Sequence, residues 1–207
     1  MSAADDGATD DLRALANAPL RRQAAALERI IRTDPDLMAI LVLIRDLRLP
    51  DGWLLAGCLY QTVWNVMENR PRGHGVKDYD IGYFDGSDLS YEAEDAEIAR
   101  VVARAPSGLD LELRNQARVH LWFKEKFGFA VSPLTCTLES LARYASVTHA
   151  VAARLADNGE IEIAAPFGMR DLFAMHLRPN RALPNGPSHD AKAKRCQSLW
   201  PVTVEWW

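Results

Sequence analysis

Apolar side chains between Leu20 and Leu47 recur every three to four residues, the spacing that places them along one side of an α-helix. The run Thr33-Asp34-Pro35 interrupts this pattern with the residues of a turn and a helix start, because Asp can cap a helix and Pro fits its first turn. We therefore expect two consecutive helices in this segment, one ending near Thr33 and the next beginning near Pro35.

Three short segments have the pattern of β-strands. Residues 53–57 are continuously apolar, as in a buried strand, whereas residues 78–84 and 109–113 alternate acidic with apolar side chains. Strand side chains repeat every two residues, so Asp110 and Glu112 share one face and the leucines beside them share the other. Helical patterns follow each of these segments, over residues 58–68, 88–104 and 115–127.

Beyond Gly128 the pattern predicts short helices, a brief strand at 161–163, and a basic, partly irregular segment from Arg178 to Trp207. The short helices are expected at 137–144, 147–155 and 169–176. The whole pattern predicts an α+β fold, in which a small mixed sheet flanked by helices precedes a mostly helical annex. The expected divisions are a disordered acidic tail (1–11), a core (12–128), and an annex with the basic C-terminal segment packed on the core (129–207).

Composition supports a soluble globular protein. Of the 207 residues, 48% are hydrophobic and 25% are charged, which excludes a disordered chain, a collagen and a coiled coil. No apolar run is long enough to span a membrane, and the acidic start differs from a secretory signal. Cys58, Cys136 and Cys196 lie far apart, which favours a reducing compartment over a disulfide framework or a zinc knuckle. We therefore expect a cytoplasmic protein that does not contact a membrane.

The charge distribution argues against a long nucleic acid as partner. The formal net charge is −4, and the first eleven residues contribute four aspartates and no Lys or Arg. From Leu12 onward the charges balance, so the chain lacks the overall basic excess that releases counterions from a polynucleotide. Only a local basic patch remains, for which the segments 178–180 and 192–195 are the candidates.

Three acidic residues on two predicted strands can hold a metal. Asp78 and Asp80 lie two apart, so both carboxylates emerge from one face, and Glu112, with Asp110 beside it, occupies the later acidic strand. Mg²⁺ prefers oxygen ligands, and a converging acidic cluster is tolerable only when a cation neutralises it. The alternatives are that the aspartates face water on an edge strand and that Glu112 pairs with a nearby arginine, either Arg114 or Arg118.

A glycine stands where the first predicted strand gives way to a helix, in the sequence Leu55-Ala56-Gly57-Cys58. Helix N-termini carry unpaired backbone N–H groups, and glycine lets a phosphate approach the backbone closely. This junction is therefore a candidate triphosphate site. The alternative is that Gly57 only permits a tight turn.

Together these motifs resemble a known superfamily. The segments that carry the resemblance are Gly57-Cys58, Trp64-Asn65, Lys77 to Ile81, Glu112 to Trp122, Ala165 to Gly168, and Asp171 to Phe173. They resemble the nucleotidyltransferase superfamily typified by DNA polymerase beta, and more closely a bacterial nucleotidyltransferase-like family within it. The likeness extends from about Leu20 to the C-terminus, and the stretch from Asn115 to Trp122 is its most specific part.

The resemblance implies a polymerase-beta-like nucleotidyltransferase core and transfer of a nucleoside monophosphate from an NTP to an acceptor, with release of pyrophosphate. Asp78 and Asp80 match the metal-binding pair, and Glu112 matches the third carboxylate, so all three are expected as catalytic residues and ligands of Mg²⁺ or Mn²⁺. Glu112 is expected to deprotonate or orient the acceptor hydroxyl. Cys58 stands where the superfamily usually has Ser or Gly, which removes a hydroxyl donor.

Further residues are expected to bind the nucleotide. They are Gly57, Cys58, Asn65, Lys77, Asn115, Gln116, Arg118 and His120, with Asp110 and Arg178 as additional candidates. Arg118 suits bidentate binding of a phosphate, and Asn115 can cap a helix while presenting its amide to a ligand. His120 is either a ligand contact or a satisfied structural histidine, and Lys77 is either a phosphate-proximal or an edge charge.

The sequence therefore predicts a metal-dependent nucleotidyltransferase that acts on a small-molecule or protein acceptor. It does not specify the NTP, the acceptor or the oligomeric state. Two other classes stay open. One is a non-catalytic nucleotide- or metal-binding module, in which Cys58 has weakened phosphate capture. The other is an antitoxin-like interaction protein, in which the acids are scattered and the Trp-rich C-terminus forms an interface.

Overall fold

The computed structural model describes residues 11–207, so the expected acidic tail lies outside the described residues except for Asp11, which opens a helical turn. The helices, with 3₁₀ segments written η, are η1 (Leu15–Asn17), α2 (Leu20–Thr33), α3 (Pro35–Asp46), α4 (Gly57–Met67), α5 (Tyr91–Val102), η2 (Gln116–Arg118), α6 (Val119–Phe127), η3 (Thr137–Arg143), η4 (Val147–His149), α7 (Arg170–Phe173) and α8 (Gly186–Gln197). The strands are β1 (Trp53–Leu55), β2 (Tyr79–Tyr83), β3 (Leu111–Asn115), β4 (Ala152–Leu155), β5 (Ile161–Ala164), β6 (His176–Leu177) and β7 (Thr203–Val204).

The centre of the molecule is a five-stranded sheet in the order β3-β2-β1-β4-β5. Only β2 and β3 pair in parallel, whereas β1 pairs antiparallel with β2 and β4, and β4 pairs antiparallel with β5. The expected mixed sheet of an α+β fold is therefore confirmed. In the parallel pair Asp80 lies opposite Glu112, which places both side chains on the same face of the sheet.

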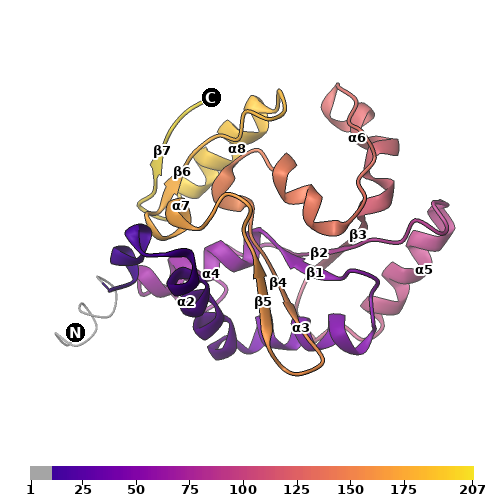
Figure 1. Ribbon diagram of the computed structural model, residues 1–207, viewed down its shortest axis with the longest axis horizontal. Coiled ribbons are helices and arrows are strands. Elements are labelled where there is room, and N and C mark those ends of the chain that lie inside the picture. The colour runs from indigo at the N-terminus through magenta and orange to yellow at the C-terminus, as the bar shows by residue number, and fades with distance from the viewer. Residues whose placement is uncertain (1–10) are drawn as a thin grey trace.

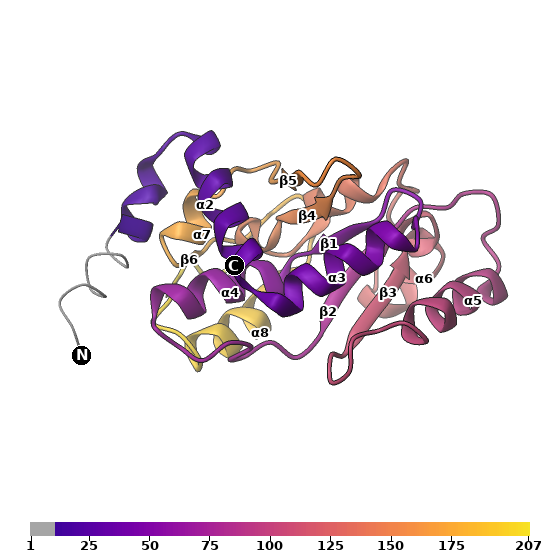
Figure 2. The same ribbon diagram turned by 90° about the horizontal axis from the view of Figure 1, so that it is seen from below.

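Helices cover the two faces of the sheet differently. Figure 1 shows α3 beneath the strands, while α6 and α8 stand on the opposite side, and Figure 2 shows α3 running across the sheet. The start of α3 is the one that the sequence predicts, because the Asp34 carboxylate accepts hydrogen bonds from Asp36 N at 2.9 Å and Leu37 N at 3.0 Å. Fully buried side chains such as Leu27, Ile40 and Trp64 fill the space between these helices and the sheet.

The helix expected at 147–155 is wrong. Only Val147–His149 is helical, and Ala152–Leu155 is the strand β4, inserted between β1 and β5. Alanine favours helices, but Ala152 and Ala153 are fully buried, and their small side chains fit a central strand that is paired on both edges. Residues 129–207 therefore add β4 and β5 to the sheet, while the division into core and annex stays a prediction.

Other boundaries also differ. The segment from Arg178 onward is more regular than expected, since it contains α8 and also β7, which pairs in parallel with β6. Pro187 lies in the first turn of α8, where proline is compatible with a helix. The helix expected at 169–176 is confined to Arg170–Phe173, and the one expected at 115–127 is divided into η2 and α6.

The last residues of the chain fix α8 in place. Trp200 is 2% exposed and packs on Trp64, with 5.5 Å between ring centroids. A Cβ atom built on Gly186 would lie 2.5 Å from the Trp207 ring, so the first residue of α8 must stay a glycine. Within residues 11–207, no helix has the length and apolarity needed to cross a membrane.

Candidate active site

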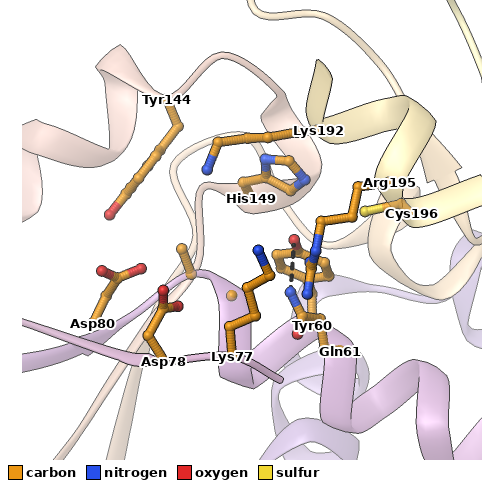
Figure 3. A pocket seen from close by; sticks show the side chains of 12 residues that line it. Tyr60, Gln61, Lys77, Asp78, Asp80, Tyr144, His149, Lys192, Arg195 and Cys196 are labelled. Carbon is orange, nitrogen blue, oxygen red and sulfur yellow. Dashed lines mark hydrogen bonds between the residues drawn. The ribbon is translucent and has the colours of Figure 1, made fainter. Parts of the chain in front are cut away.

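A cavity of about 180 Å³ lies where β1 ends, α4 begins and β2 approaches α8. Its walls come from four separated parts of the sequence, as Figure 3 shows. The lining residues are Ala56, Gly57, Tyr60, Gln61, Lys77, Asp78, Asp80, Tyr144, His149, Lys192, Arg195 and Cys196.

One wall of this cavity is acidic. Asp78 directly precedes β2 and Asp80 is the second residue of that strand, so both carboxylates point the same way in Figure 3. Burial, the Asp78 charge and the Glu112 charge raise the pKa of Asp80 from 3.8 to about 6, against the opposing charges of Lys192 and Arg114. Asp78 and Asp80 therefore line one cavity together, and the charge of Glu112 acts on Asp80 from the neighbouring strand.

Glu112 occupies the neighbouring strand and is exposed, but it borders a second cavity together with Asp80. The alternatives offered for it by the sequence are not observed, since no ion pair joins it to Arg114 and Arg118 pairs with Glu94 instead. Among residues 11–207, no three His, Cys, Asp or Glu side chains already stand in an arrangement that would hold a metal ion.

The opposite wall of the first cavity is basic. Lys192 and Arg195 lie three residues apart on α8, which places them on one face of that helix, and Lys77 joins them from the approach to β2. Figure 3 shows their amino and guanidinium groups facing the space beside the aspartates. Arg195 also donates a hydrogen bond to the carbonyl of Gly75, which ties α8 to the segment that carries Lys77 and Asp78.

The turn between β1 and α4 forms the floor of the cavity. Ala56 has φ 48° and ψ −102°, a backbone conformation that is strained for a residue with a side chain. Gly57 then begins α4, and a Cβ atom there would meet only Gln61 Nε2, at 3.6 Å. The fold itself does not require glycine at this position. Its missing side chain instead leaves room beside the first N–H groups of the helix.

Two neutral side chains at the back of the cavity have unpartnered polar atoms. His149 is 2% exposed and stacks on Tyr60, with 4.6 Å between the rings, but its Nε2 atom has no hydrogen-bond partner. Burial lowers the pKa of His149 well below 6.5, so its ring is neutral at pH 7. Gln61 donates to the Tyr60 hydroxyl at 3.1 Å, and its Oε1 atom is also unpartnered. Such atoms are costly to bury and indicate groups that a ligand can satisfy.

Several of the residues that line this cavity could not be identified from the sequence. Tyr60, Gln61, Tyr144 and His149 stand among apolar neighbours without a motif, and only the chain's crossing of α4, η3 and η4 brings them together. The basic run 192–195 was the one signal available, and two of its residues do line the cavity.

The structure does not bring the Cys58 side chain into the cavity. The thiol is fully buried in the core and points toward the carbonyl of Leu55, with 3.8 Å between Sγ and the oxygen. Burial raises the pKa of this thiol well above its usual value, so it stays protonated. Only the backbone of Cys58 remains at the start of α4, so nucleotide binding by this residue stays a prediction for its backbone N–H group alone.

Asn65 also lies away from the cavity. Its amide donates to the carbonyl of His74 at 2.9 Å, and its oxygen accepts from Trp200 Nε1 at 2.9 Å. Both ends of the side chain are therefore used to join α4, the loop before Lys77 and the segment after α8. This buried amide is structural rather than ligand-binding.

Asn115 and Arg118 likewise support the fold. The Asn115 side chain accepts from Asp85 N at 3.1 Å and donates to Asp85 O at 2.8 Å, while also capping η2. Arg118 forms a buried ion pair with Glu94 and donates to the carbonyl of Leu89 at 3.0 Å. The expected phosphate contact of Arg118 is therefore not available, because its guanidinium is already paired.

The remaining candidates are dispersed. Gln116 borders the second cavity, whereas His120 lines neither cavity and has a buried Nδ1 atom without a partner. Asp110 is exposed and precedes β3. Arg178 is held by Asp171, with N–O distances of 3.1 and 2.7 Å, outside both cavities.

Comparison with solved structures shows that this fold is shared by two other proteins. An NMR structure described as a CCA-adding enzyme head domain superposes with a TM-score of 0.68 at 24% identity, covering 87% of this chain and 95% of that one. The Thermotoga maritima CCA-adding enzyme, solved in complex with tRNA, superposes with a TM-score of 0.53 at 16% identity. That match covers 86% of this chain but only 42% of the larger enzyme.

Comparison with curated proteins gave no significant match. The sequence profile of one family, described as nucleotidyltransferase, matches residues 42–204, a span that includes the strained turn, the acidic wall and the basic wall. By this match over most of its length, the chain belongs to the nucleotidyltransferase family.

Proposed function

We propose that this protein transfers a nucleoside monophosphate from an NTP to a hydroxyl-bearing acceptor, releases pyrophosphate, and requires Mg²⁺ or Mn²⁺. One observation carries the proposal: a single cavity sets two aspartates against three cations beside an open helix N-terminus. The free state of the three cysteines is compatible with work in a reducing compartment, for which we propose the cytoplasm of a bacterium.

The acidic wall fits a divalent cation. Asp78, Asp80 and Glu112 would hold it, because carboxylate oxygens are the ligands that Mg²⁺ prefers. Burial, together with the charges of Asp78 and Glu112, already raises the pKa of Asp80 to about 6. When bound, the cation neutralises this cluster and withdraws charge from the phosphate oxygens. The side chains adjust on binding, since no complete ligand set is formed among the described residues beforehand.

The remaining residues bind and orient the substrates. Lys77, Lys192 and Arg195 attract the triphosphate, and the bare backbone at Gly57 lets a phosphate reach the helix N-terminus. The carboxylate of Glu112 takes the proton of the acceptor hydroxyl. The acceptor oxygen then forms a bond to the α-phosphorus, the bridging P–O bond breaks, and pyrophosphate leaves with the electron pair.

For the acceptor we favour a small molecule or a protein side chain. The net charge of −4 argues against a surface that tracks a polynucleotide. The similar Thermotoga maritima enzyme was solved with tRNA, which makes a nucleic-acid end the other acceptor to test.

A second candidate is a module that binds nucleotide without turnover. The observation that favours it is the burial of Cys58, which leaves no hydroxyl or thiol donor at the start of α4. An antitoxin-like interaction protein has less support, because Asp78 and Asp80 lie together in one cavity and are not scattered over the surface.

The test is transfer of label from each of the four α-³²P-labelled NTPs to an acceptor with Mg²⁺ or Mn²⁺, in the presence of metabolite, protein and RNA pools. We expect label transfer by the wild type, a loss of at least about 100-fold in Asp80→Asn, and no change in the control Asp95→Asn, whose side chain is exposed on α5. Binding of Mg-NTP without label transfer would favour the second candidate. Transfer that persists in Asp80→Asn would overturn the proposal.

A further inference from the structure

A second cavity, of about 280 Å³, opens beside the first. The two share Asp80, Tyr144 and Lys192, so they meet at the carboxylate that faces both. Glu112 borders only the second cavity. The molecule thus has two chambers, one on each side of Asp80. The first chamber is the cavity lined by Lys77 and Arg195, and the second chamber is the cavity bordered by Glu112.

One side of the second chamber is apolar and aromatic. Trp122, Phe123 and Phe127 of α6 line it, and their rings form a continuous group. The Trp122 and Phe123 rings lie 6.1 Å apart with 27° between their planes, and Phe123 lies 4.5 Å from Phe127. Rings arranged in this way offer a surface against which another planar group can stack.

The other side has unused polar groups. Ser140 Oγ, Arg143 Nη1 and Asn185 Oδ1 are buried, and none has a hydrogen-bond partner among the described residues. They come from η3 and from the residue before α8, and the Asn185 amide donates to the Arg143 carbonyl at 3.3 Å, which holds the two segments together. Three orphaned atoms around one chamber exceed what packing alone explains, because each costs free energy to bury.

Arg143 is the most informative of the three. Among residues 11–207, no carboxylate lies within ion-pair distance of the Arg143 guanidinium. The nearest acidic residue in sequence, Glu139, accepts hydrogen bonds from Thr135 N at 2.6 Å and Thr135 Oγ1 at 2.8 Å. Partial burial lowers the pKa of Arg143, against the opposing effect of the Glu139 charge, and the guanidinium stays charged, so it can pair with an anion from outside the chain.

We infer that the second chamber binds the acceptor, and that the acceptor is a small compound with a planar ring, one anionic group and a hydroxyl. This inference rests on the proposed function, because the hydroxyl is placed at Glu112. The ring lies against Trp122 and Phe123, and the anion pairs with Arg143. The step itself is the balanced one given above: the hydroxyl proton passes to Glu112, its oxygen bonds the α-phosphorus, and pyrophosphate departs.

A small compound fits this chamber better than a polymer. The volume of the second chamber, about 280 Å³, is at the lower end of the range for small-molecule sites. This volume holds a single ring with short substituents. Its border carries four cations, Arg114, Lys126, Arg143 and Lys192, against the two acids Asp80 and Glu112, so its charge favours an anionic compound.

The experiment compares matched anionic and neutral probes. The carboxylates 4-hydroxybenzoate, 4-hydroxyphenylacetate and 4-hydroxycinnamate, and the primary amide of each, are titrated into the full chain without NTP or divalent metal. Binding is followed by the indole N–H signal of Trp122 in NMR spectra, assigned with Trp122→Phe. We expect at least one carboxylate to bind about tenfold or more tightly than its amide.

Two substitutions test the role of Arg143. Arg143→Met should abolish the preference for the carboxylate while leaving the amide unaffected. The control Arg104→Met removes an exposed cation that borders neither chamber, and it should retain the preference. Equal affinity for acid and amide in all three pairs, or a preference that survives in Arg143→Met, overturns the inference. Displacement of the carboxylate by a short ribo-oligonucleotide, but not by a second small acid, overturns the choice of a small acceptor.

The inference and the proposed function fail separately. The probe titration needs neither turnover nor metal, so a carboxylate preference without any NTP transfer would leave the chamber assigned and refute the transferase. Transfer of label with no carboxylate preference would support the transferase and refute the assignment of the second chamber.

Discussion

At the scale of single residues, Asp80 is the group on which the site depends. It sits between two like charges and is shielded from water, so its ionised form is unfavourable in the folded chain. Natural sequences retain such a residue when a ligand compensates it. The cost of ionising Asp80 should then be measurable as a lower free energy of unfolding when that ligand is absent.

We predict that Asp80→Asn stabilises the metal-free protein at pH 8 and not at pH 4. The pKa of Asp80 is about 6 in the folded chain against 3.8 ordinarily, so the folded state binds the proton more tightly. The free energy of unfolding of the wild type therefore falls as pH rises from about 4 to about 6. Its difference from the free energy of unfolding of Asp80→Asn grows to at most about 3 kcal/mol. Urea unfolding without divalent ions at both pH values measures it. A gap of equal size at both would refute the prediction, and Asp95→Asn is the control.

His149 is expected to lower the stability of the fold while contributing to nucleotide binding. We predict that His149→Phe retains the stack on Tyr60 and unfolds at the same or a higher urea concentration, because it removes an unpartnered buried nitrogen worth about 1 kcal/mol or more. The same change should weaken Mg-NTP binding about tenfold, measured by isothermal titration. A variant that loses stability but binds NTP normally would show that His149 serves the fold alone.

At the scale of elements, the ion pair of Glu94 on α5 with Arg118 joins the acidic strand β3 to the helix that covers its edge. Both side chains are buried, and Glu94 also accepts from Asn115 N at 2.8 Å. The sequence offered Arg118 as a phosphate ligand, but the structure gives it a purely architectural partner 24 residues away.

We predict that the losses from removing the two partners are not additive. Arg118→Met and Glu94→Gln should each destabilise the fold by about 3 kcal/mol, because each leaves a buried charge unpaired, whereas the double variant should lose less than the sum. Urea unfolding of the four proteins gives the cycle. Additive losses would mean that the two side chains are not coupled.

The elements also show what sequence can and cannot predict. The breaks at Asp34 and at Gly57 and the strand containing Asp80 were predictable because capping, turn and alternation are local signals. The strand β4 was not, because alanines take the conformation that their neighbours impose. Of the site, the acids were recognisable as charges within apolar strands and residues 192–195 as a basic run. His149 and Arg143 become significant only through cavities that no local pattern encodes.

At the scale of the whole molecule, the two walls of the first cavity belong to distant parts of the chain and are held at a fixed separation by Trp200. Its ring packs on the loop before Lys77, and Arg195 bonds the Gly75 carbonyl from the same side. A Cβ atom on Gly75 would lie 2.4 Å from this ring, whereas one on Gly73 would meet nothing within 4 Å.

We predict that Gly75→Ala destabilises the protein by about 2 to 5 kcal/mol, and Gly73→Ala by about 1 to 2 kcal/mol. Both glycines have positive φ, of 73° and 71°, so they share the backbone cost and only Gly75 adds the clash with Trp200. Thermal unfolding measures the difference, and Mg-NTP affinity should fall in Gly75→Ala alone as the walls separate. Equal effects of the two substitutions would show that Trp200 does not set the spacing.

The late position of α8 has a consequence for synthesis. The carboxylates are encoded by residues 78–112, but Lys192 and Arg195 leave the ribosome only after nearly the whole chain, and Trp207 must still close over Gly186. A nascent chain therefore contains Lys77 and the two aspartates before Lys192 and Arg195 are added. The contact between the acidic wall and α8 is accordingly among the last that the fold can complete.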